Sequence, residues 1–356
     1  MKTSRKILVL VVIPVLLVKL ISSTRINNIL VSSALNINNK KIINVGVLFY
    51  SLDDLFLSNL KQSLEDIENK NENRVKYTFF EGKNNVAIQN ELIDNLLKSN
   101  IDLLIIQVAS AEESVVEDVI NKVNQNNVPI IFLDVPPQVA SKLYKENSKV
   151  VFMRGDYKQL PIKEGKIVAD IWKSNKQMID RNNDDTLQYV ILQGFSPLAT
   201  ERTKYSISAI NDSGIKTQLL SLQIANWDKE LAKNAIKSLF LRYNGAIEAI
   251  ISNNDAMAIG AIEALQDYGY NKGDKSKNII VVGIDGLPEA KKLIDRGVMA
   301  GTVIQDPNVI AEALQAVGIN LINGTDPIEG TNYKLDNGEI LFPATYYEYI
   351  SKENIK

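Results

Sequence analysis

The sequence predicts an α/β protein built from two doubly wound, Rossmann-like lobes that are joined by a hinge. Over residues 42–356, apolar runs of strand length alternate with amphipathic helical patterns. The strand runs are almost continuously apolar, which is typical of parallel strands covered by helices on both faces. This pattern goes through two similar rounds, and the chain is long enough for two lobes. We therefore expect two sheets that face each other across a cleft.

The expected strands are short apolar runs that end at small or polar residues. They span residues 43–49, 103–108, 128–133, 189–192, 219–224, 249–252, 279–284 and 301–304. The expected helices repeat apolar residues at intervals of three or four positions. They span residues 55–68, 86–99, 112–124, 162–173, 229–241, 256–268 and 309–322.

The N-terminal residues have the pattern of an export signal. A basic start, MKTSRK, precedes the apolar run 7–18, as in the charged and apolar regions of a signal peptide. No clear cleavage site follows, so we interpret residues 1–23 as a signal peptide or an uncleaved membrane anchor, with a linker at 24–41. The rest of the protein is accordingly expected outside the cytoplasm, in a periplasm or on the outer face of the cell membrane.

Composition excludes several classes of function. The 356 residues include no cysteine and no histidine, and the formal net charge is −2. These absences remove disulfides, thiol nucleophiles, the commonest general base and the usual zinc ligands. Nearly balanced charge argues against a nucleic-acid partner, which would need a basic surface. We expect a protein that is not an enzyme, while a pair of carboxylates acting as in a glycosidase stays open as an alternative.

Polar residues at the ends of strand runs indicate a binding site. The run 249–252 ends in Asn253, Asn254 and Asp255, and a helical pattern then begins. Open α/β sheets bind ligands at the carboxyl ends of their strands, although at least one of these residues is expected to cap the helix. After the first strand run, the acidic pair 53–54 stands where a nucleotide-binding fold needs glycines, so a pyrophosphate would be repelled.

Taken together, the motifs resemble the bacterial periplasmic galactose/glucose-binding proteins, which are type I sugar-binding receptors. The resemblance covers residues 42 to the C-terminus. The matching motifs are Tyr50-x-x-Asp53-Asp54-x-Phe56, Trp227-Asp228, Asn253-Asn254-Asp255-Ala-Met-Ala, Gly283-Ile-Asp285-x-Leu-Pro-Glu289-Ala, Ala300-Gly-Thr-Val and Gly330-Thr-Asn-x-Lys334-x-Asp336. The resemblance implies the type I periplasmic binding protein fold and a receptor that closes on one sugar without transforming it.

Six side chains are expected to contact the sugar by this resemblance, and their chemistry suits the task. The rim hydroxyls of a monosaccharide need planar polar partners, and its C–H faces need aromatic walls. The rim partners are Asp54, Arg202, Asn254 and Asp285, and the walls are Phe56 and Trp227.

Departures from the family pattern bear on which sugar binds. Gln107 and Gln305 stand where the family has asparagines, and we include both in the site. The segment 194–202 is shorter than its family counterpart and lacks the His and Asp found there in the galactose/glucose type, which help to read the hydroxymethyl end of a hexose. We therefore expect a pentose such as D-xylose, with galactose or glucose as the alternative.

A second polar segment implies a Ca²⁺ site. Oxygen-bearing side chains occupy alternate positions from residue 180 to 188, as loops for hard cations require, but Ile191 stands where an EF-hand has its last glutamate. The resemblance implies that a distant glutamate completes the site instead. Asp185 replaces the glycine usual at a position of positive φ, which aspartate tolerates. The implied ligands are Asp180, Asn182, Asp184, Gln188, Glu248 and the carbonyl of Thr186.

The family pattern also places the lobe boundaries. Crossovers are expected near residues 132–135, 305–306 and 341–343. The N-terminal lobe is then 42–132 plus 306–341, and the C-terminal lobe is 133–305 plus 342–356.

A membrane protein is the expected partner of such a receptor. We favour a sensor histidine kinase, because an anchored copy would resemble the sugar-binding proteins that work with such kinases, and an ABC permease is the alternative. Cytoplasmic repressors share the fold but need an N-terminal helix-turn-helix and a basic face, which residues 1–41 do not supply.

Overall fold

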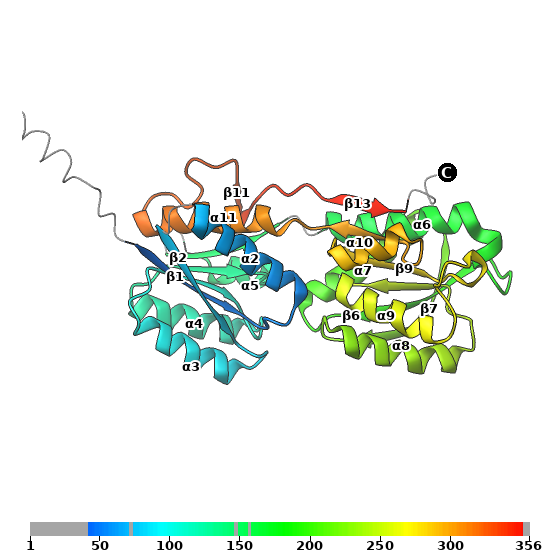
Figure 1. The fold of residues 1–356 in the computed structure, drawn as a ribbon. Coiled ribbons are helices and arrows are strands. Elements are labelled where there is room, and N and C mark those ends of the chain that lie inside the picture. Colours follow the sequence, from blue (N-terminus) through cyan, green and yellow to red (C-terminus); the bar gives the residue numbers. More distant parts are fainter. Residues whose placement is uncertain (1–41, 71–73, 146–148, 156–157, 352–356) are drawn as a thin grey trace, which may run out of the picture. The chain divides into compact units, whose positions relative to one another are not determined.

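The computed structural model describes residues 42–70, 74–145, 149–155 and 158–351 (Figure 1). The expected signal peptide or anchor and the expected linker lie outside these residues. The elements discussed below all belong to one unit that begins at Ile43. Within the described ranges, no helix is both long enough and apolar enough to cross a lipid bilayer.

The first sheet combines strands from both ends of the chain. In the described residues it has seven strands in the order β11-β12-β5-β4-β3-β1-β2. All neighbouring strands are parallel except β11 and β12. The strands are β1 (Ile43–Phe49), β2 (Val75–Glu81), β3 (Leu103–Gln107), β4 (Ile130–Leu133), β5 (Val150–Arg154), β11 (Lys334–Asp336) and β12 (Glu339–Leu341).

The second sheet has six strands in the part of the chain that the structure describes, in the order β13-β10-β9-β8-β6-β7. Only β13 runs antiparallel to its neighbour. The strands are β6 (Thr186–Gln193), β7 (Lys216–Ile224), β8 (Ala249–Ser252), β9 (Ile280–Asp285), β10 (Gly301–Ile304) and β13 (Tyr347–Ile350). The prediction of two parallel-dominated α/β lobes is confirmed.

Helices cover both faces of the first sheet. Alternate residues of a strand point to opposite faces. Val47 accordingly lies in the core cluster under α2 and α11, whereas the adjacent Leu48 lies in the cluster under α3 and α4. Figure 1 shows these two helix pairs on opposite sides of the strands. The helices are α2 (Leu55–Lys70), α3 (Val86–Leu97), α4 (Glu113–Gln125), α5 (Pro137–Leu143) and α11 (Pro307–Asn323).

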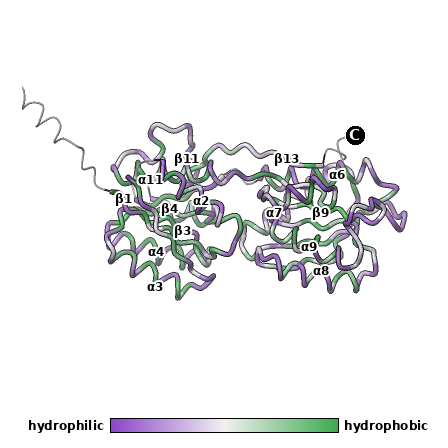
Figure 2. The backbone as a smooth tube through the Cα atoms, viewed as in Figure 1, coloured by the Kyte–Doolittle hydropathy of each residue, from purple (hydrophilic) through white to green (hydrophobic). Residues whose placement is uncertain are grey.

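The second sheet is covered in the same way. Val190 packs in the cluster that includes α8 and α9, and its neighbour Ile191 packs toward α6 and α7. In Figure 2 the hydrophobic colour follows the strands, and much of the outer path of the helices and loops is hydrophilic. The helices are α6 (Gln159–Ile179), α7 (Pro197–Asp212), α8 (Lys229–Tyr243), α9 (Asp255–Asp267), η1 (Lys275–Lys277) and α10 (Pro288–Asp295).

The first lobe boundary differs from the expected one. β5 pairs in parallel with β4, so Ile130 lies opposite Val150, and β5 belongs to the first sheet. The first crossover therefore follows Arg154 instead of lying near 132–135. The family pattern placed this crossover one strand too early, and the apolar run 150–153 of β5 is not among the expected strands. Within the described residues the chain crosses twice more, between β10 and α11 and between β12 and β13.

Candidate functional site

A cavity of about 360 Å³ lies at the carboxyl ends of strands from both sheets. Its polar groups follow β3, β8, β9 and β10, and others come from the start of α2 and the first turns of α7. All eight residues expected to contact a sugar line this cavity. They are Asp54, Phe56, Gln107, Arg202, Trp227, Asn254, Asp285 and Gln305.

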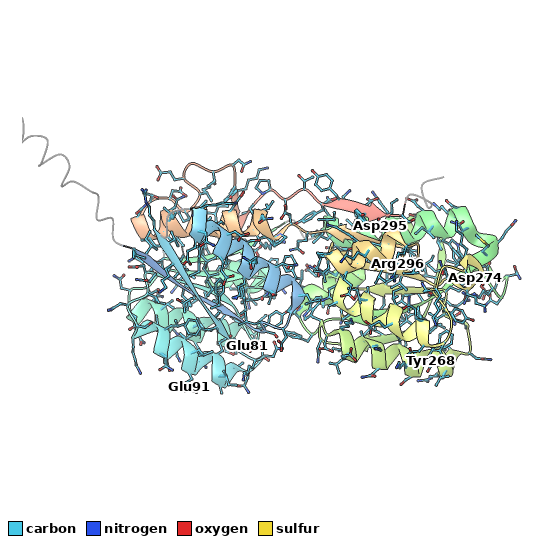
Figure 3. All side chains as sticks on the ribbon, viewed as in Figure 1. Glu81, Glu91, Tyr268, Asp274, Asp295 and Arg296 are labelled. Carbon is cyan, nitrogen blue, oxygen red and sulfur yellow. The ribbon has the colours of Figure 1, made fainter. Side chains whose placement is uncertain are left out.

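Asp54 is held at the start of α2 by two neighbours. The Tyr50 hydroxyl donates to its Oδ2 at 2.7 Å, and the backbone N–H of Leu57 donates to its Oδ1 at 3.0 Å. Asp54 therefore caps α2 and also faces the cavity. Burial raises its pKa, and the hydrogen bond from Tyr50 lowers it. The preceding loop is braced by Glu81, labelled in Figure 3, which accepts from the backbone N–H of Leu52 at 3.2 Å.

Arg202 is a buried cation whose terminal nitrogens are already engaged. It projects from α7 and is 5 % exposed. Its Nη1 donates to the carbonyl of Asn253 at 2.6 Å, and its Nη2 donates to Gln305 Oε1 at 3.1 Å. The guanidinium carbon lies 5.5 Å from the centre of the Trp227 ring, within the range of a cation–π contact. These contacts fix both the guanidinium and Gln305.

Trp227 forms one apolar wall and depends on an unusual backbone. It has a φ of 65°, and Asn226 before it has a φ of 52°. Such left-handed residues are uncommon without glycine and mark a constrained turn. Gly194 lies directly beneath the ring, where a Cβ would overlap the indole atoms. The position of the indole ring therefore depends on the strained turn at residues 226–227 and on Gly194, which leaves room for the ring at the end of the neighbouring strand.

Asn254 combines the two roles expected for it. Its Oδ1 caps α9 by accepting from the N–H of Met257 at 3.0 Å, and its Nδ2 donates to the carbonyl of Trp227 at 3.3 Å. The next residue, Asp255, is fully buried and does not line the cavity. Asp255 accepts from Thr302 Oγ1 at 2.7 Å and from the N–H of Leu287 at 2.8 Å. It thereby braces the turn that follows Asp285.

Asp285 is the most perturbed acid of the cavity. It ends β9 with a φ of 124°, a conformation that is strained for any residue but glycine. Burial raises its pKa well above the ordinary value, Arg202 lowers it, and the charges of Asp255 and Asp54 raise it. A sugar hydroxyl would therefore meet an acid whose charge is balanced mainly by one guanidinium.

The cavity lining also includes residues that were not expected to contact a sugar, among them Tyr50, Asp134 and Phe195. Gln107 Nε2 donates to Asp134 Oδ2 at 2.8 Å, and among the described residues Gln107 Oε1 has no partner although it is buried. Tyr50 and Phe195 meet edge to face with ring centres 5.3 Å apart. Asp134 follows the apolar run of β4 directly, so the same pattern of a strand ending in a polar residue could have identified it.

The segment predicted to bind Ca²⁺ folds around its own carboxylates. Asp180 Oδ1 accepts from the N–H of Asp184 at 3.1 Å. The side-chain amides of Asn182 and Gln188 both donate to Asp184 Oδ2, at 2.9 and 2.8 Å. Asp185 has a φ of 62°, so it adopts the left-handed conformation expected at its position.

Glu248 precedes β8 and lies against this segment. Its carboxylate accepts from the N–H groups of Arg181 and Gln188 at 3.1 and 2.9 Å. Burial raises its pKa to about 7, and the charges of Asp180 and Asp184 raise it as well. In the described part of the chain, no three or more acidic, histidine or cysteine side chains are already arranged as a metal site. The acids of this region lie near one another but point to backbone N–H groups.

Comparison with known proteins agrees with this geometry. Residues 45–326 match the family described as periplasmic binding protein domain. The D-galactose/methyl-galactoside binding periplasmic protein of Haemophilus influenzae is 32% identical over 314 residues, which cover 87% of this chain and 90% of the relative. The ribose import binding protein of Bacillus subtilis is 23% identical and covers 81% of this chain and 85% of the relative.

Solved structures show the same fold. A periplasmic solute binding protein of an ABC transporter from Actinobacillus succinogenes, with bound D-allose, has a TM-score of 0.68 at 20% identity, over 88% of this chain and 98% of that one. A solute binding protein from Bacillus halodurans with bound myo-inositol has a TM-score of 0.67 at 22% identity, over 89% and 97%. At these identities the likeness concerns the fold alone.

Proposed function

The chain belongs to the periplasmic binding protein family, whose members are solute receptors and not enzymes, and from this premise we propose that it is an extracytoplasmic receptor for one monosaccharide, a pentose such as D-xylose. The single observation that supports a sugar is the cavity itself. Asp54, Arg202, Asn254 and Asp285 line it with planar polar groups, together with the aromatic side chains of Phe56 and Trp227. Rim hydroxyls and C–H faces of a pyranose need this combination.

The wall formed by residues 195–198 favours a pentose over a hexose. Phe195, Pro197 and Leu198 are apolar, and the Ser196 side chain accepts from the N–H of Ala199 as a helix cap. A hydroxymethyl group placed against this wall would lose its water without a strong replacement partner, and an unpaired buried hydroxyl costs about 1–3 kcal/mol. The rival is galactose or glucose, which the name of the 32% identical Haemophilus relative supports.

Sugar selectivity is tested by calorimetry on the purified protein with D-xylose, L-arabinose, D-ribose, D-glucose and D-galactose. We expect the tightest binding with a pentose. If a hexose binds about tenfold more tightly than every pentose, a difference of about 1.4 kcal/mol, the pentose proposal is wrong and the hexose is the ligand. Phe195→His adds a polar group to the wall and is expected to move the preference toward galactose, whereas Phe195→Leu, the matched control, is not.

We further propose that Ca²⁺ binds to the segment 180–188 together with Glu248. The donor set suits a hard cation, because it contains three carboxylates and two amides whose oxygens can turn toward an ion. Thr186 begins β6 next to these side chains and would add its carbonyl. A bound cation would relieve the repulsion that raises the pKa of Glu248. The ligands would be Asp180, Asn182, Asp184, Thr186, Gln188 and Glu248.

The membrane partner is proposed to be an ABC permease or a sensor histidine kinase. The permease is supported by the names of the relatives, among them the ribose import binding protein of Bacillus subtilis. The kinase is the partner expected from the N-terminal segment, which lies outside the described residues. Copurification from membranes with and without the sugar distinguishes the two, because the captured partner is identified by its own sequence.

A further inference from the structure

A buried acid lies behind the cavity and does not line it. Glu164 projects from α6 and is fully buried. The two helices approach closely at the next residue, Gly165, where a Cβ would overlap the carbonyl oxygen of Ser206 on α7. Glu164 therefore lies next to this close approach of α6 and α7, and the Ser206 hydroxyl donates to its Oε2. An acid in such a place needs a reason, because burial of an unpaired carboxyl group destabilises the fold.

Two buried polar atoms, one on Glu164 and one on Arg202, lack hydrogen-bond partners in the described part of the chain. Among the described residues, neither Glu164 Oε1 nor Arg202 Nε has a hydrogen-bond partner. Arg202 is four positions before Ser206 on α7, so both side chains lie on the same face of that helix. Arg202 is also close enough to lower the pKa of Glu164. The Glu164 oxygen needs a donor and the Arg202 nitrogen needs an acceptor, and one buried water that bridges them would satisfy both.

We propose that Glu164 is a positioning residue for Arg202, joined to it through one buried water. Arg202 is then held from three directions: by the carbonyl of Asn253, by Gln305 and by Glu164. Only the last of these is connected to the Nε atom. The part of the proposal that concerns Arg202 itself needs no ligand, whereas its effect on sugar affinity rests on the proposed function.

The charges around Glu164 set the pH at which it ionises, so its interaction with Arg202 should depend on pH. Burial raises the pKa of Glu164 to about 8, the Ser206 hydrogen bond and Arg202 lower it, and Asp255 of α9 raises it. Asp285 of β9 shares the same guanidinium. Other charged groups on the elements packed against α6 lie at or near the surface. They are Glu201, Lys204 and Asp212 of α7, Lys275 and Lys277 of η1, and Glu348 of β13.

The direction of this effect follows from the protonation state. Below about pH 8, Glu164 is neutral, and the charge of Arg202 is available to Asp285 and the cavity. Above that pH, the Glu164 carboxylate competes for the same guanidinium. Sugar affinity should therefore fall as the pH rises through about 8, and this component should disappear when Glu164 cannot ionise.

The first experiment follows the Nε–H signal of Arg202 by nitrogen-15 NMR in the full chain, labelled at arginine, without any ligand. The signal is assigned by its loss in Arg202→Lys. We expect it to titrate with a midpoint near pH 8 in the wild type and to be flat over the same range in Glu164→Gln, which keeps an acceptor oxygen. Glu164→Ala should shift the signal and speed its exchange with water. The exposed Asp170→Ala on the same helix should change neither.

The outcomes are decisive even if Glu164→Ala does not fold. An Arg202 signal that titrates equally in wild type and in folded Glu164→Gln would overturn the proposal. The second experiment measures the Kd of D-xylose and of D-galactose by calorimetry between pH 6.5 and 9.5. We expect roughly a three- to tenfold loss of affinity in the wild type and no such component in Glu164→Gln. If neither sugar binds, the proposed ligand is wrong, and the NMR titration still decides the role of Glu164.

Discussion

The two sides of the cavity differ in how fully the protein itself uses their polar groups. On the side of the second sheet, Arg202 and Asn254 are buried, and both terminal nitrogens of Arg202 and both amide atoms of Asn254 bond to backbone or side-chain partners. On the side of the first sheet, Asp54 is bonded to Tyr50 and Leu57 but stays partly exposed, and Gln107 keeps an oxygen with no partner in the described residues. The side of the second sheet is therefore the organised side, whose polar groups are held in place before a ligand binds. The side of the first sheet is the open side, which keeps polar atoms that a ligand must satisfy.

If this contrast holds, the largest loss of affinity comes from the organised side. Asp285→Ala removes an acceptor that lines the cavity and an acid that interacts with the Arg202 guanidinium. Hydrogen bonds to charged groups contribute about 1.5–3 kcal/mol, so we expect sugar binding to weaken by roughly 10- to 150-fold. Calorimetry measures this loss. Asp295→Ala is the control, because Asp295, labelled in Figure 3, accepts a hydrogen bond from Tyr349 and lies at the end of α10, outside the cavity lining.

A backbone change tests whether the same side depends on tight packing. Gly194→Ala would place a methyl group against the Trp227 ring and force the ring out of position. Overpacking of this kind costs about 1–3 kcal/mol, and we expect affinity to fall by roughly tenfold or more. The measurement is a Kd with a parallel melting curve. Gly82→Ala is the matched control, because the backbone of Gly82 is not left-handed and a Cβ there would meet its nearest neighbour, the Phe49 carbonyl oxygen, at 3.5 Å, an ordinary contact. Unchanged affinity in Gly194→Ala would contradict the proposed wall.

The open side should respond more weakly. Gln107→Leu removes the unpartnered oxygen and also the donor to Asp134. We expect a three- to tenfold loss of sugar affinity, corresponding to about one hydrogen bond. Asp134→Asn, which keeps the shape of the pair, should lose less. A loss larger than that of Asp285→Ala would reverse the comparison between the two sides.

The smallest effect on sugar binding is expected from the proposed Ca²⁺ segment, which lies apart from the cavity lining. Glu248 has a pKa of about 7 in the folded protein, above its ordinary value. Between about pH 4.5 and 7, the folded state holds a proton that the unfolded state has lost, so stability without Ca²⁺ should fall as the pH rises across this window.

Melting curves in Ca²⁺ and in a chelator check this prediction. Glu248→Gln should flatten the pH dependence measured in the chelator, and Asp184→Ala should abolish any stabilisation by Ca²⁺. Sugar affinity should stay within about twofold in both variants. If the wild type has the same melting temperature in Ca²⁺ and in the chelator, the proposal that Ca²⁺ binds this segment is wrong.

The eight residues selected from the sequence line one cavity, whereas the first lobe boundary expected from the sequence does not match the observed sheets. The eight selected residues converge because parallel strands place their carboxyl ends at one edge of a sheet. β2 is absent from the expected strands because it is an edge strand, in which buried and exposed residues alternate instead of forming a continuous apolar run. α7 was missed because its helical face is weakly apolar. Glu164 could not be found from sequence, since its role depends on the close approach of two helices at Gly165.

The crossovers also constrain how the protein is made. The first lobe takes β5 early in the chain but receives α11 and β12 only after the whole second sheet up to β10 has been synthesised. During synthesis from the N-terminus, the outer side of β5 therefore has no partner strand until β12 follows. An open strand edge is a template for wrong pairing, so the nascent chain should need protection for most of its synthesis. Neither lobe can be obtained intact by truncating the chain at a single point.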